Sequence, residues 1–258
     1  MQTYWLTQTN EDMPVTNDWL SAVEIIRLNG FRFPKRRTDW RLGRWTAKQA
    51  IASCLHWPAH PMLLAQIEIR ATFSGAPEAL LPGVTTPFSF SISHRAGMAM
   101  CALSSVRVKL GCDVELVEPR TPTFVTDYFS PEEQNLVARE APEDSPEVVT
   151  LLWSAKESAL KALGQGLRLD TRDFTVTPLE GQPDICGWSP LQVQCPDAQT
   201  LHGWWRATDN FVYTVVSHPA PQCPIEIRMD EPAASARYFS DHDSIFALQD
   251  YVPEESAS

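Results

Sequence analysis

Asp113 and Glu115 stand two residues apart at the end of an apolar run that begins near Val106. Side chains two apart in a strand point to the same face, so this spacing predicts two neighbouring carboxylates. Mg2+ takes oxygen ligands and commonly sits between one or two carboxylates and the phosphates of a substrate. A surface edge strand gives the same pair, so the spacing alone leaves both interpretations open.

Trp153, Glu157 and Lys161 recur every four residues in a segment of helical periodicity. The three side chains therefore share one helix face, with a carboxylate and an ammonium one turn apart. That spacing is most often found in an exposed Glu–Lys pair on a helix surface, which contributes little to stability. The tryptophan beside it favours a functional site over an evenly charged surface.

Two further groups could bind an anion. The alternating segment 88–94 is typical of a half-buried strand and ends on Ser93 and His94, although a lone histidine also serves structural roles. A helical segment interrupted by one acid, Asp39, carries a basic series that suits either a phosphate cradle or a solvated helix face: Lys35, Arg36, Arg37, Arg41, Arg44 and Lys48.

The sequence around these residues predicts a mixed fold of α-helices and β-strands. Segments 88–94, 98–103 and 106–114 predict a small antiparallel sheet in the middle of the chain. Ser130-Pro131-Glu132-Glu133 predicts a capped helix start, and a second helix should run from Ser145 to Leu163. Further strands are expected at 174–177, 191–194, 204–207 and 211–217. Sheet content thus recurs in both halves, without an evident direct sequence repeat.

Composition narrows the class of ligand. The 258 residues carry a net charge of −11, which disfavours non-specific binding to nucleic acid or anionic lipid. No segment has the length and apolarity of a membrane span or a signal peptide, so we expect a cytoplasmic protein with six reduced cysteines. Pro58 and Pro61 disfavour a zinc site near Cys54, and Gly164-Gln165-Gly166 lacks the lysine of a P-loop.

Two motifs together give the sequence its clearest resemblance. Gly111-Cys112-Asp113-Val114-Glu115 and Trp153-Ser154-Ala155-Lys156-Glu157-Ser158-Ala159-Leu160-Lys161 resemble the two signatures of the 4'-phosphopantetheinyl transferase superfamily. Ser91-Ile92-Ser93-His94 is similar to the family's upstream S-x-S-H element, and Trp40-Arg41-Leu42-Gly43-Arg44 to an early helix segment. The resemblance spans roughly residues 35 to 218.

The resemblance implies an enzyme that transfers phosphopantetheine from coenzyme A to a serine of an apo acyl or peptidyl carrier protein, releasing adenosine 3',5'-bisphosphate. It implies Mg2+ at Asp113, Glu115 and Glu157, with Glu157 and Lys161 as catalytic residues. The implied coenzyme A ligands are Arg37, Arg44, Ser93, His94, Lys156 and Lys161. Carrier contact is implied at 166–173, where Arg168 and Arg172 offer a basic patch.

The length resembles that of the surfactin-type branch. That likeness implies an α+β monomer in which two similar α/β halves, small antiparallel sheets packed with helices, form an intramolecular pseudodimer. We expect the coenzyme A-binding half over residues 1–108, the metal-binding and catalytic half over 109–223, and an acidic extension over 224–258 that ends in a flexible tail. The family's G-[KR]-P element is represented by Gly75-Ala76-Pro77, so one phosphate contact is lost or supplied by the Lys35 to Lys48 segment.

Three alternatives stay open. Another magnesium-dependent phosphoryl or nucleotidyl transferase, or a pyrophosphate hydrolase, could use the same carboxylates. No other nucleotide signature accompanies them. A family member without activity could bind coenzyme A or carriers only, but Asp113, Glu157 and Lys161 are all retained.

Overall fold

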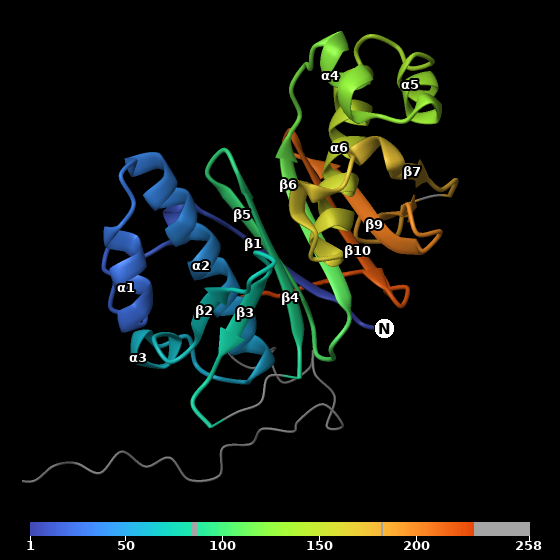
Figure 1. Cartoon of the computed structure of the whole chain (residues 1–258). Coiled ribbons are helices and arrows are strands. Elements are labelled where there is room, and N and C mark those ends of the chain that lie inside the picture. The colour runs from blue at the N-terminus through green and yellow to red at the C-terminus, as the bar shows by residue number, and fades with distance from the viewer. Residues whose placement is uncertain (84–86, 182, 230–258) are drawn as a thin grey trace, which may run out of the picture.

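The first half of the chain is a sheet backed by one long helix (Figure 1). The computed structural model describes residues 1–83, 87–181 and 183–229. The sheet has the order β11-β1-β5-β4, and a separate hairpin pairs β2 with β3. The elements of this half are β1 (Tyr4–Thr9), α1 (Ala22–Asn29), α2 (Pro34–Cys54), α3 (Pro61–Leu64), β2 (Glu68–Ala71), β3 (Pro77–Leu80), β4 (Ser89–Arg95) and β5 (Met98–Ser104), with a 3-10 turn at Asn10–Asp12.

The second half repeats this plan with the helix α6 lying across a five-stranded sheet of order β6-β10-β9-β8-β7. Its elements are β6 (Lys109–Leu116), α4 (Pro122–Tyr128), α5 (Pro131–Val137), α6 (Ser145–Ala162), β7 (Thr175–Pro178), β8 (Ser189–Gln194), β9 (Thr200–Thr208) and β10 (Phe211–His218), with 3-10 turns at Gly166–Arg168 and Thr171–Asp173. The predicted α+β fold of two similar halves is confirmed.

The middle of the chain differs from the three-stranded sheet expected there. β4 and β5 pair as predicted, but β6 pairs with β10, so that Cys112 lies opposite Val215 in the second sheet. Residues 105–108 carry the chain from one sheet to the other. β4 and β6 still approach each other, because the Cys112 amide donates to Ser91 Oγ at 3.1 Å. The two sheets therefore meet along these two strands.

Matching helices reveal a repeat that the sequence analysis missed. The buried part of α2 reads Trp45-Thr46-Ala47-Lys48-Gln49, and the corresponding part of α6 reads Trp153-Ser154-Ala155-Lys156-Glu157. Each of these helices is followed along the chain by a hairpin and then by two further strands. Five residues were too short a signal to find without the topology that aligns them.

Three clusters of buried apolar side chains hold the fold together. One lies under α2, one surrounds α6, and the third joins the two sheets. In the third cluster Trp5 meets Trp188 edge to face, with ring centroids 5.3 Å apart. Such aromatic pairs stabilise beyond their buried area. The halves thus form one packed body rather than two domains on a linker.

The end of the described chain returns to the first half. β11 (Ile225–Glu226) pairs in parallel with β1, and the side chain of Ile227 is buried. Residues 225–227 therefore belong to the first sheet, whereas the sequence analysis placed them in the acidic extension. The tail expected at the last ten or so residues lies outside the described residues. No helix in the described part has the length and apolarity to cross a bilayer.

Candidate functional site

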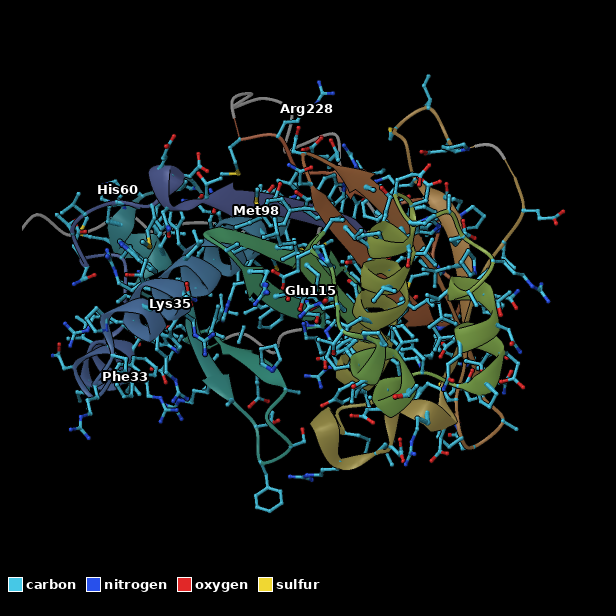
Figure 2. All side chains as sticks on the ribbon, turned by 90° about the horizontal axis from the view of Figure 1, so that it is seen from above. Phe33, Lys35, His60, Met98, Glu115 and Arg228 are labelled. Atoms are coloured by element: carbon cyan, nitrogen blue, oxygen red, sulfur yellow. The ribbon has the colours of Figure 1, made fainter. Side chains whose placement is uncertain are left out.

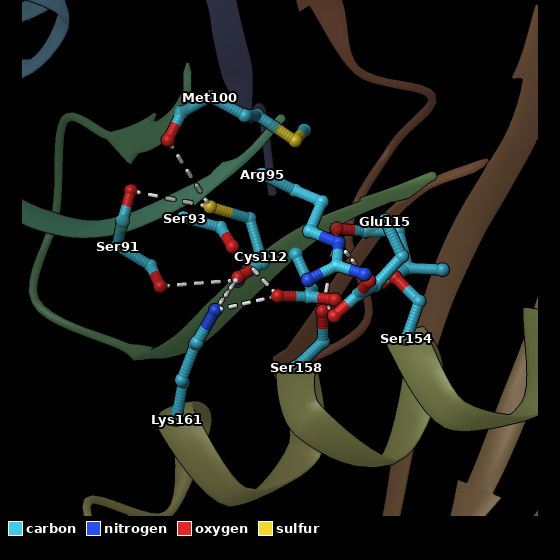
Figure 3. Close-up of polar contacts among 11 residues, drawn as sticks. Ser91, Ser93, Arg95, Met100, Cys112, Glu115, Ser154, Ser158 and Lys161 are labelled. Atoms are coloured by element: carbon cyan, nitrogen blue, oxygen red, sulfur yellow. Dashed lines mark hydrogen bonds and ion pairs between the residues drawn. The ribbon is translucent and has the colours of Figure 1, made fainter. Parts of the chain in front are cut away.

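The candidate site lies where β4, β6 and α6 meet (Figure 3). Asp113 is buried on β6, and its Oδ1 accepts hydrogen bonds from Ser93 Oγ at 2.6 Å and Lys161 Nζ at 2.7 Å. Lys161 Nζ also donates to the carbonyl of Cys112 at 3.0 Å. One residue from each of three predicted motifs therefore converges on a single carboxylate.

Gly111 explains why this convergence is possible. A Cβ at position 111 would lie 1.8 Å from the Ser158 carbonyl oxygen and 2.7 Å from the Ala162 amide nitrogen. Only glycine lets the backbone of α6 come this close to β6. The hydroxyls of Ser154 and Ser158 fasten the same helix face to Thr214 on β10, at 2.9 and 2.7 Å.

Glu115 lies between the two halves, as the view from above shows (Figure 2). Arg95 and Arg120 are its neighbours: Arg95 Nε lies 3.3 Å and Arg120 Nη2 lies 3.5 Å from Glu115 Oε2. Burial raises the pKa of Glu115, with a further increase from Asp113, and the two arginines oppose this shift. The sequence analysis did not include either arginine, and nothing in their spacing marked them.

Glu157 is half-buried on α6, one turn before Lys161. Burial raises its pKa, Lys161 lowers it, and the negative charge of Asp113 raises it again. The negative charge of Asp113 therefore acts as a like charge on both of the other predicted metal ligands, Glu115 and Glu157. A cation between them would relieve that repulsion.

The donor set fits a magnesium ion that is completed by a substrate. Asp113 Oδ2 and Glu115 Oε2 are buried and accept no hydrogen bond. Within the described residues, no three or more His, Cys, Asp or Glu side chains are grouped to hold a metal by themselves. Mg2+ is typically held by one or two carboxylates together with phosphates and water, so an incomplete carboxylate set is consistent with it.

Lys156, which was expected to contact a phosphate, is engaged inside the protein. Its side chain is fully buried, and Nζ donates to the carbonyls of Thr171 at 2.6 Å and Phe174 at 2.8 Å. The third partner is Glu133 at 2.6 Å, whose other oxygen accepts from the Val176 amide. With all its N–H groups engaged inside the protein, Lys156 fastens α5, α6 and β7 together.

The coenzyme A ligands expected in the first half lie on α2 and β4. Gly43 brings α2 against β4, since a Cβ there would lie 3.5 Å from His94 Cδ2. Desolvation lowers the pKa of His94, Asp39 raises it, and Lys161 and Lys35 lower it, so His94 lies between α2 and α6. The Arg44 guanidinium stacks over Trp40 and is largely buried, with Nε 3.9 Å from Glu24.

Arg37 stands apart from this group. It is exposed near the start of α2 and donates to the Phe31 carbonyl at 3.2 Å. The structure therefore brings Ser93 and Lys161 together on Asp113, with His94 next to Ser93 on β4. Of the two arginines of α2, Arg44 is largely buried and Arg37 is exposed.

A cleft of about 850 Å³ opens between the halves beside Lys161. Ala76, in the element that departs from the family pattern, lines it, as do two cations that the sequence analysis did not single out, Arg107 and Lys109. Arg107 lies in the crossing segment after β5, and Lys109 is the first residue of β6. The basic helix segment from Lys35 to Lys48 is absent from the described lining of this cleft.

The two arginines expected to contact a carrier are exposed in the 3-10 turns that follow α6. Arg172 is already engaged, since its Nη2 lies 2.6 Å from Asp170 Oδ2. Both residues lie at the surface, in the segment that follows Lys161 and the end of α6.

Comparison with known proteins shows what the chain is similar to. Residues 109–216 match the model of the 4'-phosphopantetheinyl transferase superfamily. The chain is 27% identical over 164 residues to 4'-phosphopantetheinyl transferase HetI of Nostoc sp., covering 62% of this chain and 67% of that protein. It is 34% and 31% identical over 87 residues to two Bacillus subtilis proteins, a 4'-phosphopantetheinyl transferase and Sfp. The chain spans 38% of the length of each.

Proposed function

We propose that this chain transfers phosphopantetheine from coenzyme A to a serine of an apo acyl or peptidyl carrier protein, because its residues 109–216 match the model of the 4'-phosphopantetheinyl transferase superfamily. The observation that carries the proposal is the cluster of Ser93, Asp113 and Lys161, drawn from three motifs, beside a carboxylate of raised pKa. Adenosine 3',5'-bisphosphate is the second product.

In this reaction the carrier serine oxygen forms a bond to the β-phosphorus of coenzyme A as the bond to the bisphosphate breaks. Bound Mg2+ would be held by Asp113, Glu115 and Glu157 only together with the diphosphate, because the three carboxylates are not grouped closely enough to hold it alone, and it would neutralise charge on the diphosphate. Lys161 uses two of its three N–H groups on Cys112 and Asp113, which leaves one for a phosphate oxygen. That donor acts where negative charge accumulates.

Glu157 is the proposed base for the serine proton, directly or through a water molecule. Its burial favours the protonated form, so a proton accepted from serine is held more readily than on an exposed glutamate. Ser93, by donating to Asp113, holds that carboxylate in place. Ser93, His94 and Arg44 remain the proposed contacts for the nucleotide end. The cleft that contains Arg107 and Lys109 reaches Ser91 and Ile92, on the same strand as Ser93 and His94, and offers room there.

The proposal extends to the setting of the enzyme. We propose a monomer, because the active surfaces of both halves lie within one chain, and a cytoplasmic location, as the sequence indicates. Arg168 and Arg172 are exposed and are proposed to meet the acidic helices of a carrier. Reversing both charges should weaken carrier turnover while leaving the affinity for coenzyme A unchanged.

Intact-mass spectrometry tests the activity directly. Several apo carriers are incubated with the protein, coenzyme A and Mg2+, and each is compared with the same carrier lacking its acceptor serine. We expect a gain of one phosphopantetheine, abolished by chelator and absent from the serine-free control. A protein that binds coenzyme A yet modifies no carrier would instead support the alternative of an inactive binder.

A further inference from the structure

Four side chains of alternating charge meet beside the pair of carboxylates on β6: Arg95, Glu115, Arg120 and Glu118. Besides their contacts with Glu115, Arg95 and Arg120 both reach Glu118: Arg95 Nη2 contacts Glu118 Oε1, and Arg120 Nη2 lies 3.2 Å from the same oxygen. Arg95 comes from β4 in the first half, whereas the other three belong to β6 and the segment after it. Figure 3 shows Arg95 beside Glu115. The network therefore crosses the boundary between the halves at a proposed metal ligand.

These contacts leave hydrogen-bonding capacity unused. Glu115 Oε2 accepts no hydrogen bond although two guanidinium groups lie at ion-pair distance, and the buried Nε atoms of Arg95 and Arg120 have no acceptor. Buried polar atoms without partners are costly. A ligand that offers a cation to Glu115 and an oxygen to an arginine would satisfy both sides at once. A divalent metal bound to a diphosphate has that composition.

The local charge balance points the same way. Four carboxylates (Asp113, Glu115, Glu118 and Glu157) face three cations (Lys161, Arg95 and Arg120), which leaves a net charge of −1. A divalent cation alone reverses that sign, and the two charges of a bridging diphosphate restore it. Metal and diphosphate therefore suit this site together better than either does alone.

We propose that Arg95 exchanges partners as the substrate loads: it neutralises Glu115 in the metal-free protein and passes to a phosphate oxygen of coenzyme A when the metal binds. The planar guanidinium suits both partners, since it pairs with carboxylates and phosphates alike. Arg95 is thus a positioning residue, and this role rests on the proposed function. Arg120 is less free to move, because its guanidinium also stacks over Phe124 at 5.2 Å.

The exchange makes metal and coenzyme A binding cooperative. A metal that binds alone must displace Arg95 from Glu115 with no new acceptor, whereas coenzyme A supplies one. By thermodynamic linkage, coenzyme A then raises metal affinity by the same factor by which the metal raises coenzyme A affinity. Removing the Arg95 charge should strengthen metal binding to the free protein and weaken this coupling.

The test measures Mn2+ binding by electron paramagnetic resonance, with the full chain and with or without coenzyme A. In wild-type protein we expect coenzyme A to tighten Mn2+ binding by a factor within the usual range of about 5 to 150. In Arg95→Gln, Mn2+ should bind the free protein about tenfold more tightly, while its affinity with coenzyme A present changes by less than about twofold. Arg95→Lys keeps the charge and should stay close to wild type.

Arg70→Gln is the matched control, because Arg70 forms an arginine–glutamate pair with Glu68 on β2. It should leave both Mn2+ affinities unchanged, and thermal unfolding checks that every variant folds. Unchanged Mn2+ affinity of folded Arg95→Gln without coenzyme A would overturn the exchange, as would an equal gain with and without coenzyme A. Wild-type protein that binds neither Mn2+ nor coenzyme A would instead overturn the proposed function.

Discussion

The two halves share a scaffold but not its chemistry. In each half, a glutamate in a helix-capping box pairs with a fully buried lysine of the long helix: Glu24 with Lys48, and Glu133 with Lys156, both at 2.6 Å. Each lysine also donates to two backbone carbonyls, and each glutamate accepts from a strand amide. The lysine in the middle of the family's helical motif is therefore part of the repeated scaffold.

The proposed catalytic and metal-binding groups lie in the second copy. Gln49 occupies the place of Glu157, and Ser53 that of Lys161. Counting along each hairpin from its turn, Leu6 and Gln8 of β1 correspond to Asp113 and Glu115 of β6. The first half thus has amides and an apolar side chain where the second has carboxylates.

The difference teaches which parts of a motif fold the protein and which do chemistry. Residues that recur in both halves hold helix to sheet, whereas residues found only in the second half surround the proposed metal site. The first half contributes to that site from its sheet edge instead, through Ser93, His94 and Arg95.

Glu157→Gln should produce the largest effect, because it gives α6 the residue that α2 carries. Losing both the proposed base and a metal ligand should reduce kcat/KM by about a thousandfold or more. The raised pKa of Glu157 means that folding stability falls as pH rises and the buried carboxyl ionises, so the neutral amide should leave thermal stability at pH 7 unchanged or higher. Carrier modification and thermal unfolding measure the two effects, and a strongly lowered Tm would contradict this account.

Lys48→Met and Lys156→Met should destabilise the protein alike. Each leaves a buried glutamate without its cation, which typically costs about 3–5 kcal/mol. Denaturant unfolding gives the two values. Lys161→Met is the control: it should lose activity with a much smaller loss of stability, since Lys161 is partly exposed. If a Lys156 variant folds normally but has lost coenzyme A affinity, the result would instead support the phosphate contact that was expected from the sequence.

Gly111→Ala should destabilise the second half by about 3 kcal/mol or more, because the added methyl group meets the backbone of α6 rather than a movable side chain. Gly43→Ala is the matched change in the first half. Its methyl group approaches side chains and no backbone, Ile92 at 3.3 Å and His94 at 3.5 Å, and alanine is the better helix former. Unfolding free energies should therefore differ clearly between the two variants, and similar values would contradict the close approach of α6 to β6.

The smallest effect concerns pH. The pKa values of Glu115 and Glu157 are raised above that of an ordinary glutamate, so protons compete with a metal at higher pH than they would at exposed carboxylates. Mn2+ affinity of the free protein should fall as pH decreases and these two carboxylates become protonated, by up to about tenfold per pH unit for each proton displaced. Isothermal titration in buffers of different ionisation enthalpy counts the protons released. Gln8 and Gln49, at the corresponding positions of the first half, do not titrate, so no proton release is expected from these two side chains.

Much of the second half was predictable because its signals are local. The capping box at Ser130, the periodic helix from Ser145 and the strand pair around 211–217 all depend on neighbours in sequence. β1 and α1 were missed, since Tyr4–Thr9 lacks strict alternation and α1 has only eight residues. The assignment of β6 to a second sheet depended on its pairing with β10, about 100 residues later, which no local pattern reveals.

The sequence by itself determined the motif residues and their order: a carboxylate pair on a strand, a glutamate and a lysine on one helix face, and a Ser-His strand end. Those patterns follow from the periods of strand and helix, which are properties of adjacent residues. Only the tertiary structure decided that Lys156 is buried, that Lys161 reaches Asp113, and that Arg95 and Arg120 contact Glu115. The physical reason is that charge pairing and burial depend on distances between elements, and packing alone fixes those distances.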